Sequence, residues 1–283
     1  MIFLTGDVHE MTKGAWDQRR LPQGWTEVRV CENYLEVANS HFIHPTLFFS
    51  ACAVENEIDF IRSLLTRYTF EIGGHDISMN SHRVARGLSR RILHLANGPY
   101  WLQKMDMSAT IKCILSKLNV SIASWRNHAY RMDRNTYKIA KEFGITCVSN
   151  KVNGLDSRIC EVNGIIEAPI NTLPDHESLR HGAHAKEAIC NSAEEWVDRI
   201  LLQVEYHEAH SIHSVILAHP LCMFIEDRFQ AFARLCKAIG PKSTATLRDC
   251  SEVIRQSGPS RVGNENNSST QVPLLADDGL SRT

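Results

Sequence analysis

Short apolar segments alternate with longer amphipathic segments along this chain of 283 residues. The short segments, rich in β-branched residues, predict strands at Ile2 to Leu4, Thr46 to Cys52, Thr69 to Ile72, Ile122 to Trp125, Ile145 to Val148, Gly164 to Ile170 and Ser214 to Ala218. The amphipathic segments predict helices at Val28 to Asn39, Ile58 to Tyr68, His82 to Leu95, Ser108 to Leu118, Asn135 to Phe143, Ala193 to Glu208 and Glu226 to Ile239, with a last helix over 246–255. Strands that alternate with helices in this way are typical of βα units that build a parallel sheet.

The pattern changes near the end of the chain. Residues after 256 are rich in Ser, Asn, Gly and Pro and show little periodicity, so they cannot repay the entropy cost of ordering. The remaining length suits one α/β barrel, because such barrels commonly reach about 250 residues in a single domain. We therefore predict one domain over residues 1–256 and a flexible polar tail over 257–283.

The charge balance and the cysteines narrow the class of protein. A formal net charge of -1 and an isoelectric point near 6.9 give no general basic surface, so we do not expect a nucleic-acid partner. Nine cysteines, an odd number without CxxC spacing, are typical of reduced thiols. The first residues lack a basic leader, and no apolar run approaches roughly 20 residues. We expect a cytoplasmic protein without a membrane span that acts on a small molecule.

Titratable and polar residues recur where the predicted strands end. They are Asp7 and His9 after the first strand, His75 after the third, Arg126, His128 and Tyr130 after the fourth, Asn171, Asp175 and His176 after the sixth, and His219 after the seventh. The carboxyl ends of parallel strands in a barrel face one mouth, which is where active sites lie. Each residue alone has a structural explanation, but five strand ends with such residues indicate a catalytic site.

The alternation of side chains along a strand refines this expectation. Residues two apart lie on the same face of an extended segment, so Asp7 and His9 should point the same way. The same argument groups Arg126, His128 and Tyr130, provided that the extended conformation continues that far. The predicted mouth then holds a carboxylate, a guanidinium and several imidazoles.

Five motifs in order resemble the polysaccharide deacetylase (NodB-homology) family. They are "LTGDVHE", "EIGGHDISM", "SWRNHAYRMDRNTYKIAKEFGITCVSN", "IIEAPINTLPDHESLRHG" and "SVILAHPLCMF", and the resemblance runs from about residue 2 to residue 255. It implies a distorted (β/α) barrel of about seven parallel strands. It also implies hydrolysis of N- or O-acyl groups, usually with a divalent metal. On this resemblance, Asp7 matches the catalytic base, Arg126 the residue that orients it, and His219 the general acid.

The metal-binding motif departs from the family pattern. The second acid of the first motif is Val8 here, and the second histidine of the "EIG-H" motif falls on Met79. His9 is the leading replacement, because alternation places it beside Asp7. His9 and His75, with Asp7 or His128, would make a three-ligand site of the kind that suits Zn²⁺. A weaker candidate ligand is His82, at the expected start of a helix.

Substrate recognition is less sharply indicated. Tyr130, Trp101, Asn171, Asp175 and His176 are residues of the types that stack on or hydrogen-bond to a sugar ring. With a cytoplasmic location, the resemblance favours removal of an N-acetyl group from a small or carrier-linked sugar. Two alternatives stay open. The departures at Val8 and Met79 would suit a catalytically silent barrel that binds carbohydrate, and the histidine inside "RNHAY" leaves room for an amidase that cleaves a non-sugar C–N bond.

Overall fold

The computed structural model describes residues 1–10, 20–78, 87–89, 91–92, 95–179 and 189–257. His82 and Met79, most of the helix expected over residues 82–95, and the tail after residue 257 lie outside the described residues. Within the described part, no helix is both long and apolar enough to cross a membrane. All nine cysteines are free thiols.

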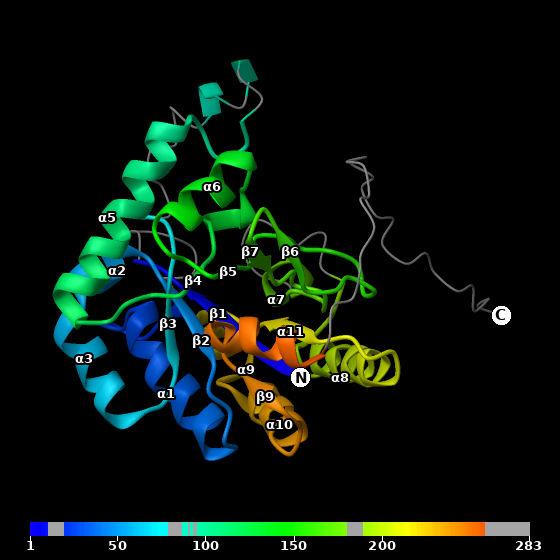
Figure 1. Ribbon diagram of the computed structural model, residues 1–283. Helices are drawn as coiled ribbons and strands as arrows, with labels where there is room; N and C mark the ends of the chain where they lie inside the picture. The colour runs from blue at the N-terminus through cyan, green and yellow to red at the C-terminus, as the bar shows by residue number, and fades with distance from the viewer. Residues whose placement is uncertain (11–19, 79–86, 90, 93–94, 180–188, 258–283) are drawn as a thin grey trace.

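One curled sheet forms the centre of the molecule (Figure 1). Its strands are β1 (Ile2–Val8), β2 (Thr46–Phe49), β3 (Glu71–Gly74), β4 (Ser124–Trp125), β5 (Cys147–Val148), β6 (Cys160–Val162), β7 (Ile165–Glu167), β8 (Ser214–Leu217) and β9 (Thr244–Ala245). The order is β6-β7-β5-β4-β3-β2-β1-β8, and β9 also pairs with β1. Every pairing is parallel except the β6–β7 hairpin. This arrangement confirms the distorted (β/α) barrel, with two strands, β6 and β9, that the sequence pattern did not predict.

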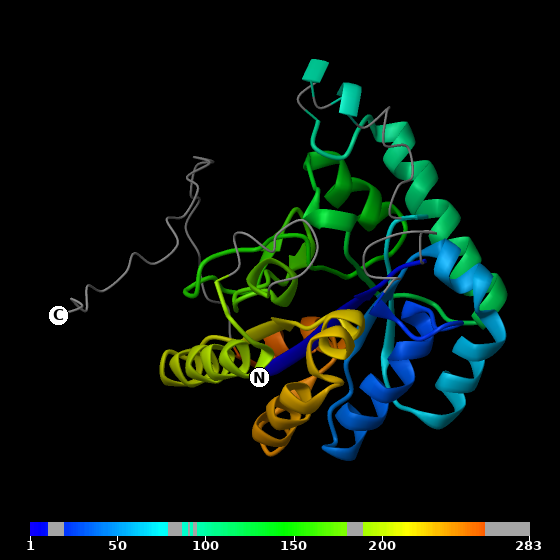
Figure 2. The same ribbon diagram turned by 180° about the vertical axis from the view of Figure 1, so that it is seen from behind.

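Helices surround the sheet on its outer side, as the view from behind in Figure 2 also shows. They are α1 (Glu27–Ser40), α2 (Ala51–Asn56), α3 (Ile58–Arg67), α5 (Tyr100–Leu118), α6 (Arg134–Glu142), α7 (Asp175–Ser178), α8 (Ala193–Ala209), α9 (Pro220–Asp227), α10 (Gln230–Ile239) and α11 (Cys250–Ser257), with short 3-10 turns at His128–Tyr130 and Leu247–Asp249. The longer ones pack side by side in the order α6, α5, α3, α1, α10, α8. The apolar stripe of each helix is therefore buried between its neighbours and the sheet.

Helix boundaries follow from capping chemistry. The Asp133 side chain accepts the Asn135 amide at the start of α6, and Thr136 completes a capping box. The single helix expected at Glu226 to Ile239 is instead two, because Arg228 and Phe229 adopt left-handed conformations that end α9 before α10 begins. The segment expected to continue β2 to Cys52 turns into α2, since the Ser50 hydroxyl caps a helix there.

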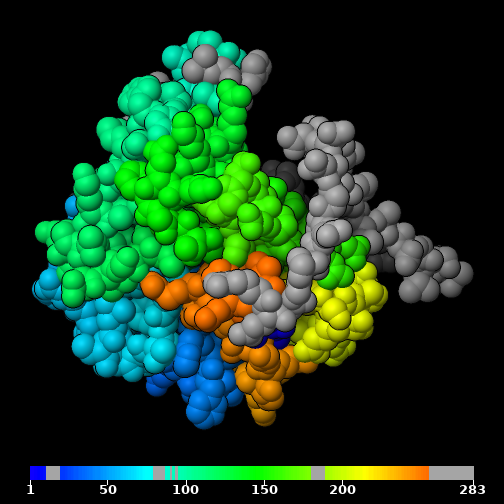
Figure 3. Space-filling model, viewed as in Figure 1, coloured from blue at the N-terminus to red at the C-terminus, as the bar shows by residue number. Residues whose placement is uncertain are grey.

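The inside of the sheet holds a second apolar cluster, separate from the core under the helices. Phe3 and Phe48 from the central strands pack with Cys250 and Val253 of α11. This C-terminal helix covers one end of the sheet, as its orange surface shows in Figure 3. The opposite end, where the parallel strands finish, holds the polar residues.

A side-chain amide joins the two sides of the sheet where strand pairing stops. Asn171 Nδ2 donates to the His213 carbonyl oxygen at 2.9 Å, and Asn171 Oδ1 accepts from the Val215 amide at 2.9 Å. The neighbouring Thr172 hydroxyl donates to the Val215 carbonyl oxygen at 3.1 Å. Asn171 thus takes the place of a strand partner for β8, and the barrel is held together at this seam by side chains.

Candidate active site

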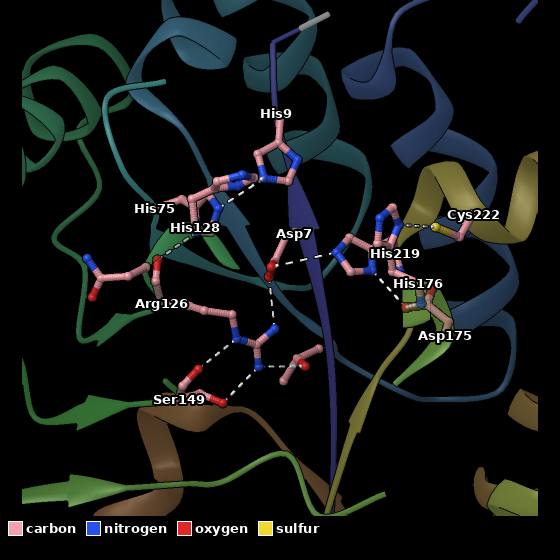
Figure 4. A network of polar contacts seen from close by, with 12 residues as sticks. Asp7, His9, His75, Arg126, His128, Ser149, Asp175, His176, His219 and Cys222 are labelled. Carbon is pink, nitrogen blue, oxygen red and sulfur yellow. Dashed lines mark hydrogen bonds and ion pairs between the residues drawn. The ribbon is translucent and has the colours of Figure 1, made fainter. Parts of the chain in front are cut away.

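A cavity of about 330 Å³ opens where β1 and β8 end. It is lined by Asp7, His9, Glu27, His128, Ala129, Tyr130, His176, Glu177, His219, Leu221, Cys222 and Ile225. Four of the five strand ends singled out in the sequence supply most of its polar wall, and α9 supplies its apolar wall. His75, at the fifth, lies behind His9 and is not a lining residue. Figure 4 shows the polar network around it.

A buried ion pair lies at the centre of the network. Arg126 Nη1 donates to Asp7 Oδ1 at 2.8 Å, and the Arg126 side chain is fully buried. Its other hydrogen bonds go to the Thr5 hydroxyl at 3.0 Å and to the hydroxyl and carbonyl oxygens of Ser149 at 2.8 and 2.9 Å. The guanidinium also lies over the Phe48 ring, 4.4 Å from its centre. These contacts fix the guanidinium, and it in turn fixes the Asp7 carboxylate.

The charge state of Asp7 follows from this setting. Burial alone would raise the pKa of Asp7, but the Arg126 guanidinium and the neighbouring His75 and His219 imidazoles outweigh it and hold the pKa below its usual range. The carboxylate is therefore ionised at neutral pH and able to accept a proton from a reacting group.

Three imidazoles converge beside Asp7. His9 Nε2 lies 3.0 Å from His75 Nε2 and 3.2 Å from His128 Nδ1 (Figure 4). We call His9, His75 and His128 the histidine triad. Two nitrogens bound to one tetrahedral zinc at about 2.0–2.1 Å would stand roughly 3.3 Å apart, close to these separations. Two of the three spacings in the triad therefore match those of ligands of one metal ion, and all three donor atoms lie within 4.8 Å of one another, so the triad could hold a divalent metal.

Hydrogen bonds on the far side of two rings orient the triad. His75 Nδ1 meets the Arg126 carbonyl oxygen at 2.6 Å, and since that oxygen only accepts, Nδ1 carries the proton and Nε2 keeps its lone pair. His9 Nδ1 lies 3.5 Å from Glu27 Oε1. Burial lowers the pKa of His75 well below its usual value, more than Asp7 raises it. Burial also lowers the pKa of His9, but Glu27 and Asp7 more than offset this and raise it.

A second carboxylate–imidazole pair lies on the other side of Asp7. Asp175 Oδ1 is 2.7 Å from His219 Nδ1, and Asp175 Oδ2 accepts the His219 amide at 2.6 Å. We call Asp175 and His219 the acid pair. His219 Nε2 points back to Asp7, 3.7 Å from Oδ2. Burial lowers the pKa of His219, but Asp175 and then Asp7 raise it by more, to about 10, so the imidazole is protonated at neutral pH.

The loop after β4 places His128 by a turn and not by strand alternation. Asn127 is extended, but Ala129 and Tyr130 both adopt left-handed conformations with φ of 54°. The Tyr130 amide donates to the Asn127 carbonyl oxygen and closes the turn. Two successive non-glycine residues in this region store strain, which is typical of functional loops. The expected alternation therefore stops at Arg126, although the turn still brings His128 and Tyr130 to the cavity.

The structure places the five residues expected to bind substrate in different settings. Tyr130 and His176 line the cavity. Trp101 is 64% exposed near the start of α5 and is not among the cavity-lining residues. The Asn171 side chain is occupied at the seam between strands, and Asp175 is fully buried under His219. Asn171 therefore has a structural role and Asp175 positions His219. Neither role could be predicted from residue type, because both depend on contacts with residues far away in the sequence.

Some residues around the cavity had not been singled out from the sequence. Glu27 is only 2% exposed and faces His9. In the sequence it has the pattern of an ordinary acidic residue in the first turn of a helix, after the Thr26 cap, and so was not singled out. Ser149 follows β5 and binds Arg126, but as an uncharged residue it was not singled out from the sequence. Cys222 reaches the cavity because it lies one helical turn after His219, a spacing visible in "HPLC".

The sequence matches no protein-family model and no curated protein. Solved structures do match. A putative polysaccharide deacetylase from Mycobacterium smegmatis has a TM-score of 0.70 at 15% identity, over 94% of each chain. An allantoinase, PuuE, gives 0.61 at 12% identity, over 87% of this chain and 86% of that one.

A third solved structure with this fold is described as a pseudoenzyme. A CE4 family pseudoenzyme from Bacillus anthracis gives a TM-score of 0.52 at 13% identity, over 88% of this chain and 65% of that one. At these identities the likeness shows the fold, so the chain has the fold of the polysaccharide deacetylases. Because that fold carries enzymes and pseudoenzymes alike, the function has to be argued from the site.

Proposed function

We propose that this barrel of polysaccharide-deacetylase fold is a metal-dependent hydrolase that removes an N-acetyl group from a sugar or a sugar-linked precursor. The observation that carries the proposal is the convergence of the histidine triad, Asp7 and the acid pair around one cavity. A deacylase needs these three parts: a place for a metal and water, a base, and an acid for the departing nitrogen.

His9, His75 and His128 would hold the metal. The donor set, three imidazole nitrogens, suits Zn²⁺. A zinc-type ion held there would polarise the acyl carbonyl and make a bound water more acidic. The replacement of the family's second acid by Val8 and of its second histidine by Met79 is then compensated by His9 and His128, which come from β1 and the loop after β4.

Asp7 acts as the general base in this proposal. Its carboxylate is ionised because Arg126 pairs with it, and Arg126 is itself fixed by Thr5 and Ser149. A base held in one orientation loses little entropy when it accepts a proton from the attacking water. Arg126 is accordingly a positioning residue that acts through Asp7.

His219 acts as the general acid. A pKa of about 10 keeps its Nε2 protonated at neutral pH, and Asp175 holds the ring so that Nε2 faces Asp7. A departing amine requires a proton, which this imidazolium supplies. The base and the acid face each other across 3.7 Å, so one scissile bond in the cavity can reach both.

The cavity supports a small substrate. A volume of about 330 Å³ lies at the low end of the range of roughly 300–1,000 Å³ for small-molecule sites. Tyr130, His176 and Glu177 offer polar groups to sugar hydroxyls, while Leu221 and Ile225 offer an apolar wall to an acyl methyl group. These contacts favour a monosaccharide unit, free or on a nucleotide or lipid carrier. The cytoplasmic location predicted from the reduced cysteines stays a prediction.

The allantoinase likeness favours one further candidate, an amidase that cleaves a non-sugar C–N bond. His128 in the triad comes from the same "RNHAY" segment that left this possibility open in the sequence. Both candidates use the same base, acid and metal position, and they differ only in what fills the rest of the cavity. A catalytically silent carbohydrate-binding barrel is the remaining alternative.

Acetate release from acetamido sugars and their nucleotide-linked forms, with the ring-opened acid (allantoate) measured from allantoin in parallel, tests these functions. We expect zinc-loaded protein to release acetate and Asp7→Asn to lose roughly 10²–10⁴-fold in kcat/KM. Asp59→Asn is the matched control, since Asp59 is 92% exposed on α3. Equal rates for wild type and Asp7→Asn would remove Asp7 from the base role, and sugar binding without turnover would support the silent barrel.

A further inference from the structure

Asn127 is the residue between Arg126 and His128, and its hydrogen bonds tie it to the ends of two other strands. The Asn127 amide donates to Asn150 Oδ1, after β5, at 2.6 Å. Asn127 Nδ2 donates to Asp76 Oδ1, after β3, at 3.0 Å. Asn127 is 2% exposed and is not a cavity-lining residue. Any influence of Asn127 on the cavity therefore acts through the residues beside it.

These bonds belong to a row of buried polar groups that crosses the strand ends. The Asn150 amide donates to Glu167 Oε1 at 2.9 Å, and the Tyr137 hydroxyl of α6 donates to Glu167 Oε2 at 2.8 Å. We call Asp76, Asn127, Asn150 and Glu167, each no more than 2% exposed, the buried polar row. It joins the ends of β3, β4, β5 and β7, so the sheet itself fixes its position.

The Asn127 carbonyl oxygen closes the turn that carries His128. It accepts the Tyr130 amide at 3.0 Å, and Ala129 and Tyr130 in that turn adopt left-handed conformations. Non-glycine residues in this region carry strain and persist only where their surroundings hold them. Asn127 gives the turn a fixed starting point. It therefore decides where His128 Nδ1 lies relative to His9 Nε2, 3.2 Å away.

Asp76 gives the matching support at the end of β3. It directly follows His75, whose Nε2 lies 3.0 Å from His9 Nε2. The Asp76–Asn127 hydrogen bond therefore links the backbone beside His75 to the backbone beside His128. The ring centres of these two histidines are 5.8 Å apart, so one side-chain contact spans the strand ends that carry both.

The buried polar row is not the arrangement that stability alone favours. Asn127 Oδ1 and Asn150 Nδ2 are buried and have no hydrogen-bond partner among the described residues. A buried polar atom left unpaired costs free energy, and apolar side chains of similar shape would avoid that cost. Such departures from local stability are expected at functional sites, so this one indicates a role in geometry.

We infer that Asn127 and Asp76 are positioning residues for the histidine triad, and that their hydrogen bond sets the separation of His75 from His128. Asn127 acts through His128, and Asp76 acts through His75. This positional role stands on the contacts above. Its consequence for metal affinity rests on the proposed function, in which the triad holds the ion.

The zinc affinity of the full chain, measured by competition with a chelator, tests that consequence. Asn127→Ala and Asp76→Ala should each weaken zinc binding by about 10–100-fold, the usual effect of losing an outer contact of a metal site. The double variant should bind no more weakly than the weaker single variant, because both changes remove the same contact. Asp76→Asn keeps an oxygen that accepts from Asn127 Nδ2, so its zinc affinity should stay close to that of wild type.

Gln103→Ala is the matched control for a purely structural effect. Gln103 is 3% exposed, and its side-chain amide donates to the Gly98 carbonyl oxygen and to Asp133, where α5 meets α6. Its loss should lower the free energy of unfolding, as the loss of Asn127 should, but leave the zinc affinity unchanged. Urea unfolding of each variant establishes that it is folded.

A crystal structure of Asn127→Ala tests the positional role without metal or turnover. We expect the His128 ring to leave its contact with His9 while β3 and β4 stay paired. An unmoved His128, or a zinc affinity equal to that of wild type, overturns the inference. A wild-type chain that binds no zinc removes the metal from the proposed function, and the position of His128 in the variant then decides the inference alone.

Discussion

His75 and His219 are both buried histidines at the ends of parallel strands, yet they are held in opposite protonation states. His75 faces a backbone carbonyl oxygen, which accepts a hydrogen bond from the ring but carries no full negative charge, so burial dominates and the pKa of His75 falls. His219 faces the Asp175 carboxylate, which more than offsets burial and raises its pKa to about 10. The neighbour of the ring, more than its depth, decides whether it offers a lone pair or a proton.

The same contrast divides the cavity into two sides. In the proposed reaction, the histidine triad would offer nitrogen lone pairs to a cation, and the acid pair on the other side would offer a proton to a leaving group. Asp7 lies between them, paired with Arg126, and is close enough to His219 to act on the same bond. A hydrolase that uses a metal needs this separation, because a protonated imidazole cannot bind the ion and a neutral one is a weaker acid.

The largest expected effect separates the two sides by metal content. His75→Ala should lose the metal equivalent held by the triad and reduce deacylation to background. His219→Ala should keep that equivalent while kcat/KM falls roughly 10²–10⁴-fold. Metal analysis of dialysed protein beside rate measurements checks both, and His210→Ala, at the exposed C-cap position just after α8, is the control. If His219→Ala lost the triad equivalent as well, the division into two sides would be wrong.

The next effect concerns protonation of the acid. In wild type, kcat/KM should fall as the pH rises through about 10, where His219 loses its proton. In Asp175→Asn the largest cause that raises the pKa of His219 is gone while burial, Asp7 and Glu27 remain, so this basic limb should move to clearly lower pH. The protonated fraction of His219 at pH 8, and with it kcat/KM, should then fall. A pH profile with an unmoved basic limb would show that Asp175 does not set the state of His219.

A smaller effect is expected from Glu27. Glu27→Gln keeps the shape of the side chain but removes the charge beside His9 Nδ1, so zinc affinity at the triad should fall by about 10–100-fold. Competition with a chelator of known affinity measures this change. Glu36→Gln, on the exposed face of the same helix α1, should leave the affinity as it is. Equal affinities for the two variants would mean that Glu27 does not support the triad.

Trp101 should give the smallest effect. Its side chain is 64% exposed, so Trp101→Ala should change the free energy of unfolding by less than about 0.5 kcal/mol. Acetate release should be unchanged in KM, because Trp101 is not part of the cavity wall. A raised KM would return Trp101 to the substrate-binding role that its residue type indicated.

These contrasts also show how far the sequence could be interpreted. Local periodicity and motif order predict the strands, most helices and the sequence of polar residues at the strand ends. The same evidence grouped His9, His75 and His128 as candidate metal ligands. Local pattern could not supply contacts that depend on distant backbone. The two-residue strand β9 has no periodicity to detect, and the role of Asn171 depends on the β8 backbone, 42 to 44 residues away.

The acid side was the harder half to predict for the same reason. Asp175 and His219 are 44 residues apart in sequence, and a polar segment such as "NTLPDHE" does not reveal which of its acids turns inward. Glu27 lies in the first turn of α1, where acidic residues are common because they stabilise the helix. That role accounts for Glu27 in the sequence, so nothing there indicated its contact with His9. A catalytic role that depends on contact between two residues far apart in the sequence can be assigned only once the fold is known.

The position of β1 in the sheet has a consequence for how the protein reaches its native state. β1 lies between β2 and β8, and its contact with β8 joins residues 211 positions apart, as Thr5 and Ile216 do. β1 is synthesised long before β8 and β9. The edge of β1 that pairs with these two strands therefore stays unpaired until most of the chain has been made. Pairings of such high contact order fold slowly. Asp7 and His219 can come together only once β8 has paired with β1, so we expect proton-transfer competence to appear late in refolding.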